Sequence, residues 1–140
     1  MNEAEMLQKA YSVARVYHGD QMYGDMPYLY HLLQVRDSVA GFGLNHQIVA
    51  MLHDVLEDTA YTETDLRMTF GQDVVDAVVA MTKLKGEYIV DYLARVMAND
   101  IAHVVKIHDT MCNLQESVKT KQWRRVTKYC KQLEILVEDK

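Results

Sequence analysis

Apolar side chains recur every three or four residues along most of the chain, the spacing that places them on one face of an α-helix. The first such stripe consists of Leu7, Ala10, Tyr11, Ala14 and Tyr17. The same spacing predicts further helices over about 27–40, 45–57, 62–71, 74–79, 87–97, 100–116 and 123–137. We therefore predict an all-α fold, a single bundle-like helical domain that covers residues 1–140.

A few residues set the expected helix boundaries. Pro27, the only proline, suits the first turn of the second helix. Asn45 is expected to be the N-cap of the third helix, which would continue through Glu57. The segment Thr62-Glu63-Thr64-Asp65 has the pattern of a capping box. The polar stretch 19–27 is expected to be a loop, and the chain should turn near 83–86.

Composition narrows the class of protein. A chain of 140 residues favours one domain. A net charge of −5 argues against a nucleic-acid partner, but it leaves room for a small phosphorylated ligand. No stretch is long and apolar enough to cross a membrane. The spacing of Cys112 and Cys130 fits neither a zinc knuckle nor a disulfide framework, so we expect two buried thiols in a reducing cytoplasm. A homo-oligomer is possible.

Candidate chemistry first appears in the predicted third helix, in the run His53-Asp54-Val55-Leu56-Glu57-Asp58. Residues three and four apart share a helix face, which would group these four polar side chains. Buried polar groups need a partner, and a metal ion accepts both a neutral imidazole nitrogen and a carboxylate oxygen. By itself the run is explained equally well by a solvated helix end.

Two further segments add candidate metal ligands. Asp109 follows the mostly apolar run 104–108, and Asn113 lies four residues later on the same face. His31 closes the segment Pro27-Tyr28-Leu29-Tyr30-His31. Three predicted helices therefore each offer a ligand, which favours a metal site over an isolated acidic cluster.

These motifs, taken in order, resemble the HD-type hydrolase domain of the RelA/SpoT alarmone enzymes and its small stand-alone relatives, including the metazoan SpoT homologue. The matching residues are His18, Gln21, Pro27, Tyr28 and His31; His53, Asp54, Glu57, Asp58 and Thr59; Phe70, Gly71, Thr82 and Lys83; and 97–101, Lys106, Asp109, Asn113 and Leu114. The resemblance extends from about residue 10 to residue 114.

The resemblance implies a metal-dependent phosphohydrolase that cleaves a nucleotide through a metal-activated water, most directly at the 3′-diphosphate of ppGpp. It implies one divalent ion, most often manganese, held by His31, His53, Asp54 and Asp109. Glu57 and Asp58 would then act as catalytic carboxylates beside the open coordination positions. Asn113 is similar to a family residue that contacts the substrate.

The sequence departs from the family where the nucleotide is expected. Met22, Tyr23 and Gly24 replace basic residues after the early Gln, and further replacements are Leu32, Thr110 and 115–116. Tyr23 could stack on a base instead. Positive charge could come from Lys83, from Lys85, or from the later group Lys119, Lys121, Arg124 and Arg125, which is otherwise a solvated helix face. The alternatives are an HD phosphohydrolase acting on a deoxynucleotide or a dinucleotide cofactor, and a nucleotide- or protein-binding HD domain without turnover.

Overall fold

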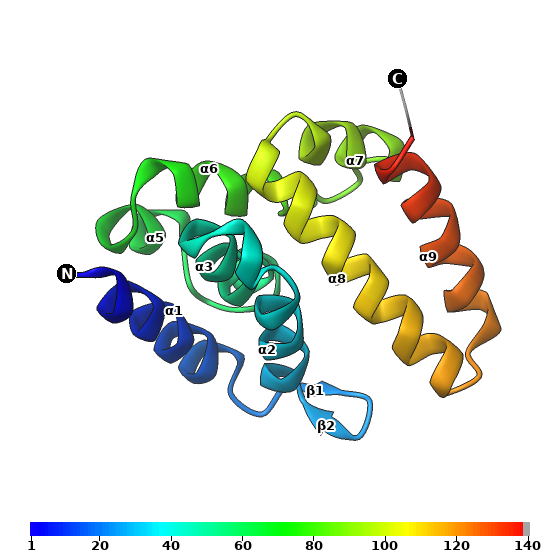
Figure 1. Ribbon diagram of the computed structural model, residues 1–140, viewed down its shortest axis with the longest axis horizontal. Helices are drawn as coiled ribbons and strands as arrows, with labels where there is room; N and C mark the ends of the chain where they lie inside the picture. Colours follow the sequence, from blue (N-terminus) through cyan, green and yellow to red (C-terminus); the bar gives the residue numbers. More distant parts are fainter. Residues whose placement is uncertain (139–140) are drawn as a thin grey trace.

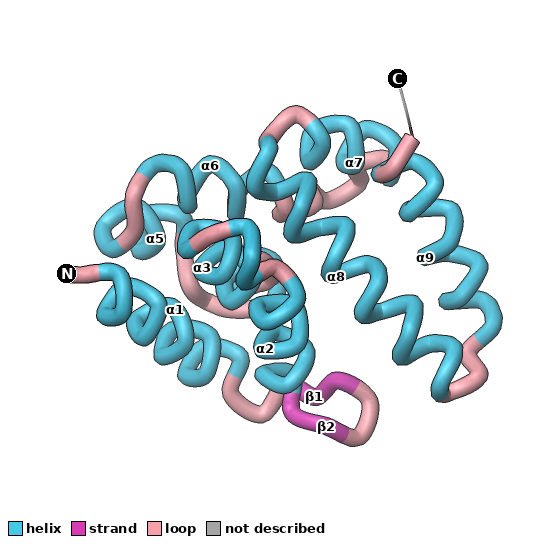
Figure 2. The backbone as a smooth tube through the Cα atoms, viewed as in Figure 1, coloured by secondary structure: helices cyan, strands magenta, loops and turns pink. Residues whose placement is uncertain are grey.

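The computed structural model describes residues 1–138, which fold into α-helices and one small hairpin (Figures 1 and 2). The elements are α1 (Glu3–His18), β1 (Met22–Tyr23), β2 (Met26–Pro27), α2 (Tyr28–Ser38), a 3₁₀ turn (Ala40–Phe42), α3 (Leu44–Leu52), α4 (Val55–Asp58), α5 (Glu63–Thr69), α6 (Gln72–Ala80), α7 (Ile89–Met97), α8 (Asp100–Lys119) and α9 (Trp123–Leu136). The predicted all-α class is confirmed.

Helix α3 is the centre of the core. It packs against α1, α2, α6 and α8, and every residue from 48 to 52 is buried. Helix α8 lies between α2 and α3 on one side and α9 on the other, and it packs against α9 along its length (Figure 1). The C-terminal end of α3 therefore lies beside both α2 and α8.

Local sequence signals place several helix ends as expected. The capping box at the start of α5 is confirmed: the Thr62 hydroxyl accepts from the Asp65 N–H at 3.1 Å, and the Asp65 carboxylate accepts from the Thr62 N–H at 3.0 Å. Pro27 marks the boundary but does not lie in the first turn of α2 as predicted, because it ends β2 with a ψ of 143° and is the N-cap of the helix. The β-branched run 74–79 is helical, within α6. Within residues 1–138, no helix combines the length and the apolar character needed to cross a membrane.

The prediction for the third helix was wrong at both ends. The helix begins at Leu44, so Asn45 lies inside its first turn and Gly43 is the N-cap. Gly43 has a φ of 134°, which a glycine adopts without strain. It ends at Leu52, and a short separate helix, α4, follows after His53 and Asp54. Asp54 has φ −106° and ψ 0°, outside the α-helical region. In a continuous helix the side chains of His53 and Asp54 would point about 100° apart around the axis. The break instead lets His53 Nε2 approach Asp54 Oδ2.

Two smaller predictions also need correction. The stretch 19–27 is not entirely loop, because Met22–Tyr23 pairs antiparallel with Met26–Pro27 across a turn in which Gly24 has a φ of 61°. Cys112 is buried as expected, but Cys130 is exposed, since it lies on the outer face of α9.

Candidate metal centre and substrate cavity

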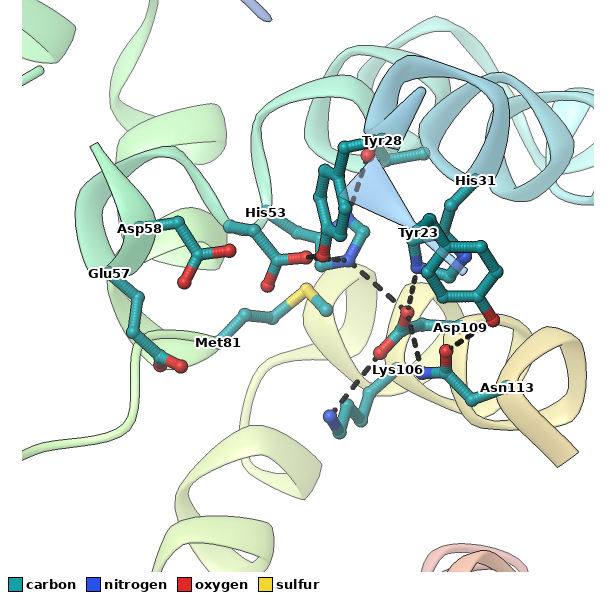
Figure 3. A network of polar contacts seen from close by, with 12 residues as sticks. Tyr23, Tyr28, His31, His53, Glu57, Asp58, Met81, Lys106, Asp109 and Asn113 are labelled. Carbon is teal, nitrogen blue, oxygen red and sulfur yellow. Dashed lines mark hydrogen bonds and ion pairs between the residues drawn. The ribbon is translucent and has the colours of Figure 1, made fainter. Parts of the chain in front are cut away.

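Four predicted metal ligands converge where α2, α8 and the break between α3 and α4 meet (Figure 3). His31 Nε2 lies 2.7 Å from Asp109 Oδ1, and His53 Nε2 lies 3.3 Å from the same oxygen. His53 Nε2 is also 3.1 Å from Asp54 Oδ2. His31, His53 and Asp109 are buried, whereas Asp54 is partly exposed. The structure thus brings together side chains separated by up to 78 residues in sequence.

The protonation of His53 tests whether this cluster suits a cation. His53 Nδ1 lies 2.7 Å from the Ala50 carbonyl oxygen, which can only accept, so Nδ1 carries the proton. In the neutral ring Nε2 then carries a lone pair that faces the carboxylates of Asp54 and Asp109 and is repelled by them. Within residues 1–138 this nitrogen has no hydrogen-bond partner. A divalent ion placed there removes this repulsion. Metal-binding histidines commonly donate their other N–H to a carbonyl in this way.

The pKa shifts of His53 and Asp109 also indicate that this site favours a cation. Burial alone would lower the pKa of His53, but Asp54 and Asp109 outweigh it and hold that pKa well above its usual value. Burial alone would raise the pKa of Asp109, but His53 and Lys106 hold it well below its usual range. The carboxylates therefore concentrate negative charge at a buried point and favour a cation, proton or metal.

Neighbouring polar groups fix the carboxylates. The Tyr28 hydroxyl donates to Asp54 Oδ2, and Lys106 Nζ lies 3.3 Å from Asp109 Oδ2. Burial and Asp54 raise the pKa of Tyr28, so its hydroxyl stays protonated as a donor. Asn113 Nδ2 donates to Asp109 Oδ1 at 3.3 Å. Each carboxylate is thus oriented before any ligand arrives.

Glu57 and Asp58 extend from α4 at the edge of the cluster (Figure 3). Glu57 Oε1 accepts from the Lys83 backbone N–H at 2.9 Å. Asp58 Oδ2 accepts from Gln21 Nε2 at 3.1 Å, and His18 Nδ1 in turn donates to Gln21 Oε1 at 2.7 Å. Partial burial, followed by the charge of Asp54, raises the pKa of both carboxyl groups.

A cavity of about 860 Å³ opens beside the cluster. Asp54 and Asp109 line it together with Glu57 and Asp58, and so do the predicted substrate residues Tyr23, Lys83 and Asn113. Its volume is in the range of small-molecule sites. The predicted metal, catalytic and substrate residues therefore face one common space, except for the two buried histidines behind it.

The profile of the HD domain family matches residues 10–133. The chain belongs to the HD domain family. The resemblance found in the sequence motifs is confirmed at this level, and it covers all the candidate site residues. The chain spans less than a fifth of the length of the bacterial relatives that it matches.

Two bacterial relatives illustrate the similarity. The chain is 40% identical over 85 residues to a guanosine-3′,5′-bis(diphosphate) 3′-pyrophosphohydrolase of Aquifex aeolicus, covering 58% of the chain and 12% of that protein. It is 32% identical over 141 residues to a GTP pyrophosphokinase of Streptomyces coelicolor, covering 92% of the chain and 17% of that protein.

A solved structure shares the fold. It is described as a metazoan orthologue of SpoT that hydrolyses ppGpp, and it superimposes with a TM-score of 0.77 at 22% identity. The match covers 95% of this chain and 86% of the other. The helical arrangement of the HD domain is therefore the same in both.

Within this HD domain Tyr23 lines the cavity, but part of its side chain is already engaged by neighbouring residues. One face of its ring stacks on His31, with centroids 4.4 Å apart and planes at 20°. Its hydroxyl donates to Asn113 Oδ1 at 2.7 Å, which occupies the oxygen of that amide (Figure 3). Tyr23 thus supports a candidate ligand and a candidate substrate residue at once.

The sequence reasoning missed several residues of the cavity. Tyr28 was noted only as part of a motif, and nothing in the residue spacing shows that it reaches Asp54. Tyr92, Lys128, Tyr129 and Lys131 also line the cavity. Of the later basic group, Arg124 and Arg125 line it, whereas Lys119 and Lys121 do not. The separate candidate Lys85 does not line it either. The sequence pattern predicts that α9 is a helix, but it does not show which face of α9 packs against α8.

Proposed function

We propose that this HD domain is a metal-dependent pyrophosphohydrolase that removes the 3′-diphosphate of ppGpp or a closely related nucleotide. The observation that carries the proposal is the buried group of two imidazoles and two carboxylates that opens onto the same cavity as Glu57 and Asp58. The activities named for the bacterial relatives and for the metazoan structure support the choice of substrate.

In this proposal one divalent ion, manganese by the family resemblance, is held by His31, His53, Asp54 and Asp109. When bound, such an ion supplies positive charge that polarises a phosphoryl oxygen and lowers the pKa of water. The protein's part is to hold the ligands in place. The Ala50 carbonyl oxygen orients His53, the Tyr28 hydroxyl orients Asp54, and Lys106 and Asn113 orient Asp109.

Glu57 and Asp58 act as the catalytic carboxylates. A carboxylate with a raised pKa accepts a proton from an attacking water more readily than an ordinary one. The Lys83 N–H fixes Glu57, and the His18–Gln21 pair fixes Asp58, so both side chains hold their oxygens at the cavity. A domain that only bound nucleotides would have no use for this arrangement.

The remaining parts of the proposal concern the ligand and the setting. Lys83, Tyr23 and Asn113 lie where a nucleotide in the cavity would meet them. The partner is a small nucleotide, and the setting is turnover of the stringent-response alarmone in a reducing cytoplasm.

The test is product analysis with purified protein and manganese. Cleavage of ppGpp should give GDP and diphosphate in equal amounts. The Asp54→Ala variant and a chelated sample should give neither. Release of single phosphates, or turnover that survives in Asp54→Ala, would contradict the proposal.

A second candidate is hydrolysis of a different nucleotide by the same residues. The hairpin favours it, because Met22, Tyr23 and Gly24 stand where the related alarmone enzymes carry basic residues. A panel containing ppGpp, a deoxynucleoside triphosphate and a phosphorylated dinucleotide cofactor separates the two candidates. A higher kcat/KM on a member other than ppGpp would favour the second.

A further inference from the structure

The cavity has acidic residues at one end and a group of basic residues along α9. Its acidic residues, Asp54, Glu57, Asp58 and Asp109, all belong to the metal end. Its basic residues are Lys83, Lys106, Arg124, Arg125, Lys128 and Lys131. These are six of the 15 Lys and Arg of a chain whose net charge is −5, and four of them come from one helix, α9. Lys106 pairs with Asp109, and the Lys83 backbone N–H binds Glu57, so these two belong to the metal end. The other four place positive charge along the α9 side of the same cavity.

Three of these side chains form a line on α9. Arg124, Lys128 and Lys131 are spaced four and three residues apart, which places them on one helix face. All three are exposed, and we call them the outer stripe. The neighbouring face carries Tyr129 and Gln132, which are buried against the body of the domain. The outer stripe therefore borders the cavity mouth along about two turns of helix.

The outer stripe has no acidic partner within residues 1–138, where no carboxylate lies within 4.0 Å of these side chains. Lys128 Nζ lies 5.1 Å from the centre of the Tyr129 ring, and the Arg125 guanidinium lies 5.7 Å from it. Neighbouring like charges repel one another. A solvated helix face would explain exposed cations, but not their gathering at the cavity that holds the candidate metal ligands.

We propose that the outer stripe binds a second phosphate group of the substrate, separate from the group that is hydrolysed. This inference rests on the proposed function. If the metal end holds the scissile diphosphate, the rest of the nucleotide extends along the cavity toward α9. Phosphate oxygens accept charge-assisted hydrogen bonds from Lys and Arg. The outer stripe then supplies the charge that Met22, Tyr23 and Gly24 do not, and it selects nucleotides phosphorylated at two separate positions.

The test compares two pairs of charge-removing substitutions. Lys128→Gln/Lys131→Gln removes two charges from the outer stripe. Lys119→Gln/Lys121→Gln removes two exposed charges that do not line the cavity, so it is the matched control. The first pair should raise the KM for ppGpp about tenfold, as expected for two partly solvated ion pairs. Its kcat should stay within about twofold, because the groups lie away from the reacting bond.

The control pair should change KM by less than about twofold, since salt screens distant charges. The KM of the outer-stripe pair should also depend less on salt than that of the wild type. Equal changes in both pairs would show a general charge effect and overturn the inference. So would an unchanged KM in the outer-stripe pair, or a loss confined to kcat.

A binding measurement separates this inference from the proposed function. The Kd for ppGpp is measured with manganese in a Glu57→Gln background, so that the nucleotide is not consumed. The outer-stripe pair should weaken binding about tenfold and the control pair should not. If the wild type cleaves no ppGpp, the proposed function fails while this comparison still decides the role of α9. If ppGpp is cleaved and both pairs bind it equally well, only the inference fails.

Discussion

The two ends of the cavity are built in opposite ways. At the metal end His31, His53 and Asp109 are buried in contact with one another, each at most 4% exposed. The cations of the outer stripe on α9 are exposed and have no acidic partner in the described part of the chain. Fixed, desolvated groups suit the chemical step, because they pay no reorganisation cost during reaction. Exposed charges on a helix surface suit recognition, since substitutions there leave the packing of the fold intact.

The largest expected difference between the two ends concerns turnover. Glu57→Gln removes a carboxylate that can take a proton but leaves the proposed ligands untouched. We expect kcat on ppGpp to fall about 10²- to 10⁴-fold, the usual contribution of a positioned general base. Steady-state kinetics at saturating manganese measures this, and KM should change far less than in the outer-stripe pair. A variant with wild-type kcat would remove Glu57 from the catalytic role.

A smaller effect is expected where the metal end is held in place. Tyr28→Phe deletes the hydroxyl that donates to Asp54 and keeps the ring. Loss of such a supporting hydrogen bond typically costs about 10- to 100-fold in metal affinity. The manganese concentration giving half-maximal activity should rise by that factor, while activity at saturating manganese largely recovers. An unchanged manganese dependence would show that this hydrogen bond does not support the ligand.

The smallest expected difference is in the reactivity of the two cysteines, one on α8 and one on α9. Cys112 lies on α8 at the buried side, where burial, and then Asp109, raise its pKa to about 11. Cys130 is exposed on α9. A thiol reagent at neutral pH should therefore react rapidly with one thiol per chain in the native protein and with two after unfolding. Two fast thiols in the native protein would contradict the packing of α8.

Much of this arrangement could be predicted from sequence, and the exceptions have physical causes. Helical periodicity located the helices, and the family resemblance of the motifs named all four candidate ligands. Periodicity could not reveal the break at His53 and Asp54, because the run 44–58 carries a continuous helical pattern. Yet this break lets the consecutive side chains of His53 and Asp54 both reach the candidate metal site.

The cavity wall was harder to predict for a different reason. A basic helix face has the same sequence pattern whether it faces solvent or a ligand. Only the packing of α9 on α8 distinguishes Lys128 from Lys119. Likewise, the contact of Tyr23 with His31 depends on a hairpin of four paired residues, too short to leave a clear alternating pattern.

The central claim is that His31, His53, Asp54 and Asp109 form one metal site. Equilibrium titration of chelator-treated protein with manganese tests it without relying on any substrate. The wild type and the Glu57→Gln variant should each bind one ion per chain, and His53→Ala should lose that binding while keeping its helical circular dichroism. Manganese binding that is equally tight in His53→Ala, or absent from the wild type, would contradict the claim.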